Sequence, residues 1–154
     1  MTGPHRCPLG RMESGFTLIE VLVAVLVLSV GLLGLVGLQG VALKMNHGAY
    51  VRSQASNLAY DIADAMRANR ANAASYAGTY AAVACVLDYT RLTSGPAATA
   101  DIGEWRNRLA CLLPNGSATI AIPTGTRTPT ITVTWDETRY GGTSAEAFVY
   151  TTEL

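Results

Sequence analysis

The sequence predicts an α+β protein, in which one long N-terminal helix packs against a small C-terminal antiparallel sheet. Two observations lead to this prediction. A helical pattern without proline extends from Phe16 to Arg70, a length that predicts one unbroken helix. After residue 117 the apolar residues alternate with polar ones, which is typical of strands. Hydrophobic residues make up 49% of the 154 residues, but they are spread unevenly along the chain.

Residues 1–15 show no periodic pattern and are rich in proline, glycine and arginine, which indicates a leader peptide without regular structure. No small-residue cleavage site of an ordinary secretory signal follows the later apolar run. The best-formed boundary lies before that run, between Gly15 and Phe16. Met12 is an alternative to Met1 as the start of the chain.

Residues 16–43 predict a membrane-spanning helix. Val21 to Leu38 is a run of 18 residues without a charge, and a bilayer core of about 30 Å takes about 20 helical residues. Four glycines recur at every third position, so they form a groove in which helices can pack closely or the helix can unwind locally. They are Gly31, Gly34, Gly37 and Gly40. The general enrichment of glycine in membrane helices is the alternative explanation.

Residues 44–75 continue this helix in an amphipathic form. A narrow apolar stripe with a three-four alternation consists of Val51, Ala55, Leu58, Ile62, Ala65, Met66 and Asn69. The opposite face carries Arg52, Asn57, Asp61, Asp64, Arg67 and Arg70. Because such a stripe must be buried, we expect this half of the helix to dock on the C-terminal domain, residues 76–154.

The C-terminal domain is expected to hold one short helix and three strands. Residues 101–113 have a helical pattern, and Asp101 and Glu104 have the spacing of a capping box. The region from Tyr80 to Tyr89 is a candidate for a short turn or strand. Three segments with alternating apolar residues, separated by turn sequences, predict an antiparallel meander; they are residues 118–122, 130–135 and 147–150.

Cys85 and Cys111 both follow the apolar run, so a membrane would place them on one side and Cys7 on the other. Two cysteines in a small exported domain favour a disulfide. A Cys85–Cys111 bridge would close a loop of about 27 residues, which the loop-entropy model values at about 3 kcal/mol. Two reduced, buried thiols are the alternative.

Glu20 places a carboxylate in the apolar stretch, which is costly unless the charge is paired. Thr17 and Glu20 have the spacing of a capping box, and an acid in the first turn suits the helix dipole. Cleavage after Gly15 would in addition give Phe16 a free, mostly protonated amino group. That group can pair with Glu20 of the same chain or of a neighbouring subunit.

The opening of this helix resembles the class III signal peptide of type IV pilins and pseudopilins: Gly15-Phe16-Thr17-Leu18-Ile19-Glu20-Val21-Leu22-Val23-Ala24. The resemblance implies a type IV pilin-like fold, cleavage between Gly15 and Phe16 by prepilin peptidase, N-methylation of Phe16, and a role for Glu20 in filament assembly. The glycine series and the segments 104–116 and 131–135 are similar to the PilV family of minor pilins, the type IV pilus modification proteins.

The PilV resemblance implies a single-pass inner-membrane protein with a periplasmic C-terminal domain, which is later incorporated in a pilus. Its implied partners are other pilins and minor pilins, prepilin peptidase and the pilus assembly platform. A minor pseudopilin of a type II secretion system is the first alternative. An unprocessed, membrane-anchored periplasmic domain is the second.

Catalysis and nucleic-acid binding have little support in the sequence. The 11 basic and 11 acidic side chains cancel, and no basic patch is present. His47 stands alone near the expected membrane edge, and Asp61 and Asp64 indicate a solvated surface. Asp136 and Glu137, at a turn, are a minor candidate for a cation site. We therefore expect no enzyme activity, no cofactor and no metal.

Overall fold

The computed structural model describes residues 15–154. The predicted leader, apart from Gly15, and the prediction for Cys7 lie outside the described residues. Two compact units meet between Gly40 and Val41. The first contains the N-terminal half of the long helix, and the second contains the rest of that helix with all other elements.

Helix α1 runs from Leu18 to Ala68. The hydroxyl of Thr17 accepts a hydrogen bond from the N–H of Glu20 at 3.3 Å, so Thr17 caps the helix as its spacing predicts. After Ala68 the chain tightens into a 3₁₀ helix, η1 (Arg70–Tyr76). The helix predicted to continue to Arg70 therefore ends two residues earlier.

The N-terminal unit consists of exposed helix in residues 18–40. An 18-residue window of α1 reaches a mean hydropathy of 2.9, and none of that window is buried. Within the part of the chain that the structure describes, α1 is the one helix with the length and composition to cross a membrane. No other element of residues 15–154 covers these aliphatic side chains, and exposed apolar surface of this extent is typical of sites that contact a membrane or another protein.

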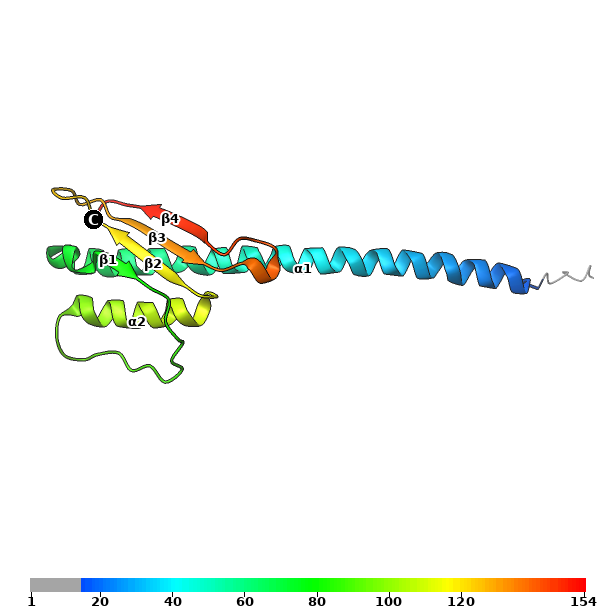
Figure 1. Ribbon diagram of the computed structural model, residues 1–154, viewed down its shortest axis with the longest axis horizontal. Helices are drawn as coiled ribbons and strands as arrows, with labels where there is room; N and C mark the ends of the chain where they lie inside the picture. The colour runs from blue at the N-terminus through cyan, green and yellow to red at the C-terminus, as the bar shows by residue number, and fades with distance from the viewer. Residues whose placement is uncertain (1–14) are drawn as a thin grey trace, which may run out of the picture. The chain divides into compact units, whose positions relative to one another are not determined.

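The second unit contains a four-stranded antiparallel sheet in the order β1-β2-β3-β4 (Figure 1). Its strands are β1 (Gly78–Tyr80), β2 (Ser117–Ala121), β3 (Thr130–Trp135) and β4 (Glu146–Thr151). β2, β3 and β4 form the predicted meander. β1 pairs with β2 and is an additional strand, which the sequence did not predict. Its three residues are too few to show an alternation of apolar and polar side chains. The short turn or strand expected in this region was placed later, from Tyr80 to Tyr89.

Helix α2 (Ala97–Leu112) separates β1 from β2 in the chain. It starts after Pro96, which makes no side-chain cap hydrogen bond. The capping box expected at Asp101 and Glu104 is therefore wrong, because both residues lie inside the helix. The carboxylate of Asp101 instead accepts hydrogen bonds from Tyr76 and Arg91, so a tertiary contact replaces the local one.

The turn from α2 into β2 depends on two residues with unusual steric freedom. Asn115 has a φ of 53°, in the left-handed region that asparagine tolerates better than most residues. A Cβ on Gly116 would lie 2.6 Å from the carbonyl oxygen of Leu109, which is backbone and cannot move aside. Glycine is therefore required there for α2 to pass directly into the sheet.

The core lies between the apolar stripe of α1, one face of the sheet and helix α2. The predicted stripe is buried, except that Ala65 and Asn69 are half-buried. The sheet contributes alternate residues of β2 and β3: Ala118, Ile120, Ile131, Val133 and Trp135. The threonines between them in β3 remain partly exposed, as a period of two requires.

Two buried tryptophans differ in what their indole nitrogen contacts. Trp105 of α2 donates a hydrogen bond of 2.8 Å from Nε1 to the carbonyl oxygen of Leu58, which ties α2 to α1. Trp135 is 1% exposed, and its Nε1 makes no hydrogen bond with residues 15–154. A buried N–H without an acceptor costs about 1–3 kcal/mol, so the two indoles contribute differently to stability.

This difference predicts unequal effects of the same substitution. Trp105→Phe and Trp135→Phe remove the same atoms, but only the first removes a formed hydrogen bond. We expect Trp105→Phe to lower the free energy of unfolding by about 1–3 kcal/mol more than Trp135→Phe. Denaturant unfolding of the full-length protein in detergent micelles measures this. Equal losses in the two variants would contradict the assignment.

Candidate functional site

The predicted cleavage site lies just outside the helix. Gly15 and Phe16 precede the first residue of α1 and are exposed, with the Phe16 side chain at 83%. Glu20 is the acidic residue of the first helical turn. Its carboxylate forms no ion pair with any residue in the range 15–154.

The glycine series faces open space within the N-terminal unit. A Cβ placed on Gly31, Gly34, Gly37 or Gly40 would meet no heavy atom within 4 Å. The fold of residues 15–154 therefore gives no steric reason for these glycines. Each glycine in a helix interior costs about 1 kcal/mol relative to alanine in water.

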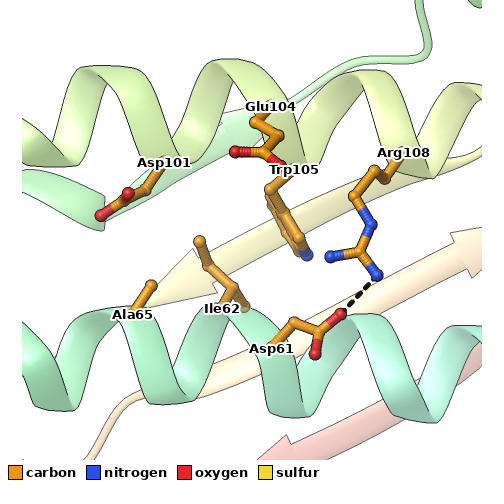
Figure 2. Close-up of a pocket in the computed structure, with 7 residues that line it drawn as sticks. All are labelled: Asp61, Ile62, Ala65, Asp101, Glu104, Trp105 and Arg108. Atoms are coloured by element: carbon orange, nitrogen blue, oxygen red, sulfur yellow. Dashed lines mark ion pairs between the residues drawn. The ribbon is translucent and has the colours of Figure 1, made fainter. Parts of the chain in front are cut away.

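A small hollow of about 110 Å³ lies between α1 and α2 in the second unit (Figure 2). It is lined by Asp61, Ile62, Ala65, Asp101, Glu104, Trp105 and Arg108. Arg108 reaches across it to the carboxylate of Asp61, with a distance of 2.7 Å between the charged atoms. Asp61 remains exposed, so the predicted solvated surface is confirmed, although the pairing with Arg108 was not expected. Asp64 is exposed as well, and it pairs with Arg67 one turn along.

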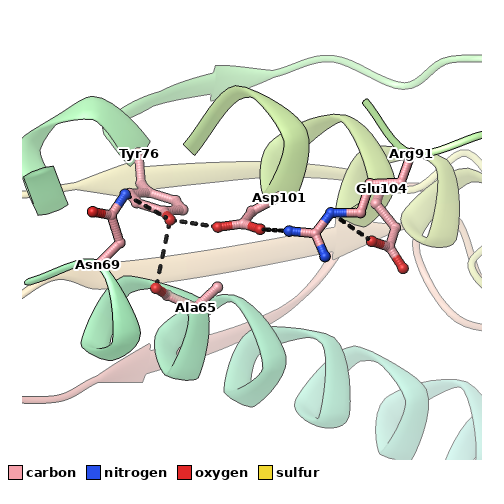
Figure 3. Close-up of polar contacts among 6 residues, drawn as sticks. All are labelled: Ala65, Asn69, Tyr76, Arg91, Asp101 and Glu104. Atoms are coloured by element: carbon pink, nitrogen blue, oxygen red, sulfur yellow. Dashed lines mark hydrogen bonds and ion pairs between the residues drawn. The ribbon is translucent and has the colours of Figure 1, made fainter. Parts of the chain in front are cut away.

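The two other carboxylates that line this hollow, Asp101 and Glu104, belong to a network of hydrogen bonds and ion pairs (Figure 3). The hydroxyl of Tyr76 donates to Asp101 at 2.6 Å. Arg91 donates to the other oxygen of Asp101 and lies 3.5 Å from the carboxylate of Glu104. Burial raises the pKa of Tyr76, and the hydrogen bond to Asp101 raises it further, so the phenol remains a donor at neutral pH. The network therefore fastens η1 and the loop before α2 to the helix pair.

The loop between β1 and α2 is held to α2 at three places. Cys85 and Cys111 form a disulfide in the structure. The amide of Asn107 donates to the carbonyl oxygen of Val86 at 2.9 Å and accepts from its N–H at 2.8 Å. The Arg91 contacts are the third. This irregular loop is thus fixed in place although it is exposed, and its residue Leu87 is 92% accessible.

The candidate cation site does not form among the described residues. Asp136 accepts hydrogen bonds from both the N–H and the hydroxyl of Thr138, which lower the pKa of its carboxyl group. The carboxylate of Glu137 lies instead against Gly48 of α1. No group of three or more potential metal ligands is present in residues 15–154. His47, expected to stand alone, stacks on Tyr140 with ring centroids 3.7 Å apart.

The comparison with protein families concerns the N-terminal segment. The model of the prokaryotic N-terminal methylation motif matches residues 10–36. The chain is type IV pilin-like at its N-terminus. The match includes Gly15, Phe16 and Glu20 and ends between the second and third glycines of the series. Searches of curated proteins and of solved structures gave no match.

Sequence reasoning missed the residues that hold the C-terminal domain, residues 76–154 and hereafter the head, together. Asn107 and Arg108 lie one after the other on α2, and nothing in their spacing indicates that one clamps a loop and the other pairs with α1. Asp101 gave a misleading signal, because its spacing to Glu104 matches a capping box although both residues lie inside α2. Only the packing of α2 on α1 distinguishes these roles.

The disulfide should contribute measurably to the stability of this small head. The two cysteines are 26 positions apart in the sequence. For a loop of this length, the loop-entropy model gives a stabilisation of about 3 kcal/mol. Cys85→Ser/Cys111→Ser is expected to lower the free energy of unfolding by about that amount. Thiol reductant should lower the stability of the natural chain similarly and leave the double variant unchanged. A reductant effect on the double variant would exclude this explanation.

Two turn carboxylates predict a loss of stability in acid. The N–H and hydroxyl of Thr143 lower the pKa of Glu146, as those of Thr138 do for Asp136. A depressed pKa stabilises the fold above the ordinary values of 4.5 and 3.8, and this contribution disappears as the pH falls through the folded pKa values. Melting temperatures between pH 6 and pH 3 measure the fall. In the double variant Thr138→Val/Thr143→Val the melting temperature should fall less steeply with decreasing pH. An unchanged slope would show that other groups cause the fall.

Proposed function

We propose that this protein is a minor pilin that takes part in the assembly, priming or modification of a type IV pilus. The observation that carries the proposal is the methylation motif over residues 10–36, at the start of a helix of 51 residues with an exposed apolar first half. Prepilin peptidase would cleave between Gly15 and Phe16, and Phe16 would then be N-methylated. The accessible, non-helical backbone at these two residues supports such processing.

Glu20 would act in assembly through charge pairing. Its carboxylate has no cationic partner within residues 15–154, and a charge in an apolar environment is costly unless it is paired. The amino group released at Phe16 supplies a cation of the required sign. Pairing with Glu20 of an adjacent subunit would neutralise both charges and set the axial offset between neighbouring helices.

The glycine series would be the surface on which neighbouring helices pack. The open space around Gly31, Gly34, Gly37 and Gly40 supports this role, since no residue in the range 15–154 occupies it. The partners would be other pilins and minor pilins, together with the pilus assembly platform. Residues 16–43 would be the assembly helix and residues 76–154 the head. Residues 44–75 would be the amphipathic segment between them, which continues the helix to Ala68 and then turns through η1.

A periplasmic head is part of the proposal. The uncharged run from Val21 to Leu38 would anchor the protein in the inner membrane by a single pass. The disulfide between Cys85 and Cys111 supports an oxidising compartment for the head. The protein would leave the membrane when it is incorporated in the pilus.

A minor pseudopilin of a type II secretion system is the second candidate. The same N-terminal chemistry serves both assemblies, whereas the glycine series and the strand segment containing Trp135 favour the PilV family. Loss of surface pili and twitching after deletion of the gene would support the pilus. Loss of exoprotein secretion with normal pili would reverse the order of the two candidates.

The mature N-terminus tests processing directly. Because the cleavage site follows Gly15, we expect mass spectrometry of the protein from its native membrane to find N-methylphenylalanine at Phe16. An unprocessed protein starting at Met1 or Met12 would exclude both pilin-like assemblies. It would leave the membrane-anchored periplasmic domain as the remaining interpretation.

Substitution of Glu20 separates insertion from assembly. Glu20→Ala keeps the apolar helix, so we expect cleavage and membrane insertion to persist, while incorporation into sheared pili falls below detection. Glu153→Ala, which removes an exposed carboxylate of the head, is the matched control and should assemble normally. Normal incorporation of Glu20→Ala would refute the charge-pairing role.

A further inference from the structure

A second, amphipathic hollow lies where the connection between β3 and β4 meets α1. Its volume is about 440 Å³, within the range of small-ligand sites. The α1 side contributes Val41, Lys44, Met45, Gly48, Ala49 and Arg52, and the connection contributes Glu137, Tyr140, Gly141 and Gly142. The lining thus combines an apolar floor with charges of both signs. Arg52 is committed in part to Glu146, at 3.8 Å.

The position of this hollow along α1 corresponds to the membrane surface. A bilayer core of about 30 Å that begins at Val21 takes about 20 helical residues and ends near Gly40. Lys44 is the first charged residue after Glu20, and it lies about 6 Å beyond that edge. This is the depth of the phospholipid headgroups, since the headgroup layers add about 5–8 Å on each side of the core.

The carboxylate of Glu137 is placed one helical turn further from the membrane. A Cβ on Gly48 would overlap its Oε1, so the carboxylate packs directly against the glycine backbone. Glu137 is half-buried and has no ion-pair partner in residues 15–154. A partly desolvated carboxylate is stabilised by a cation, and the hollow offers one side open to a ligand.

The connection that carries Glu137 is held firmly. The N–H of Glu137 donates to the carbonyl oxygen of Thr143 at 2.9 Å, and its own carbonyl oxygen accepts from Tyr140 at 3.0 Å. Tyr140 in turn stacks on His47 of α1. The carboxylate and Lys44 are therefore presented by ordered backbone on both sides of the hollow.

We propose that this hollow binds the phosphoethanolamine headgroup of a membrane phospholipid. Lys44 pairs with the phosphate, Glu137 accepts hydrogen bonds from the ammonium group one turn further out, and Val41 and Met45 contact the glycerol and upper acyl chain. Charge complementarity favours this zwitterion. An anionic headgroup without an amine would leave Glu137 facing a phosphate, and a choline headgroup has no N–H to donate. The inference rests on the membrane anchorage in the proposed function.

The lipid retained by the full-length protein tests this assignment. The protein is reconstituted in vesicles of equal parts phosphatidylethanolamine, phosphatidylcholine and phosphatidylglycerol, extracted in mild detergent and examined by native mass spectrometry. We expect phosphatidylethanolamine to be retained about fivefold over either other lipid, as one charge-assisted hydrogen-bonded pair allows. Lys44→Gln should lower retention of all three lipids.

Two variants separate the charge of Glu137 from its position. Glu137→Gln keeps the shape and should abolish the preference for phosphatidylethanolamine over phosphatidylcholine. Gly48→Ala keeps the charge, but its methyl group displaces the carboxylate, so it should weaken the same preference. Glu153→Gln, in the remote C-terminal tail, is the matched control and should retain lipid as the natural chain does.

The outcomes distinguish the headgroup site from the membrane anchor. Extraction of the protein from vesicles by alkaline carbonate would refute the anchorage itself, and with it the proposed function. Stable insertion with equal retention of the three lipids, or an unchanged preference in Glu137→Gln, would refute the headgroup site alone. Enrichment of phosphatidylglycerol would refute the assignment of a zwitterionic headgroup and would indicate a site for an anionic lipid.

Discussion

Burial of the apolar stripe on the second half of α1 is the constraint on which the rest of the fold depends. Leu58, Ile62 and Met66 are fully buried, and the sheet and α2 are arranged around them. The first half of the same helix is apolar on all sides and remains exposed. One continuous helix thus joins a segment that requires lipid or neighbouring subunits to a segment that is satisfied by its own chain.

The head is thin, and it compensates with cross-links rather than with a larger core. The disulfide, the Asn107 clamp and the network around Asp101 all fasten the segment before α2. These contacts stabilise the fold without burying much apolar surface, and a domain of this size has little apolar surface to bury. They also leave the loop around Leu87 exposed but ordered, in a fold whose proposed role is contact with other subunits.

The sequence predicted the elements whose pattern is long and regular. The helix, its cap at Thr17 and the three-stranded meander are present close to their expected bounds. β1 was missed because three residues show no period. The capping box at Asp101 was wrong because α2 begins four residues earlier, at Ala97, and the carboxylate of Asp101 instead accepts hydrogen bonds from Tyr76 and Arg91. The pairing of Asp61 with Arg108 joins two elements 47 positions apart, and no local pattern encodes such a contact.

By itself, the sequence determined the motif of the N-terminus, since the predicted cleavage site and Glu20 lie within six adjacent residues, Gly15 to Glu20. Hydropathy and helical period are also local properties, so they determined the candidate membrane-spanning stretch and the buried stripe. Only the tertiary structure decided which charges are satisfied within the head and which face outward. Glu137 meets Gly48, and Asp61 meets Arg108, because the sheet and α2 bring distant segments onto one helix.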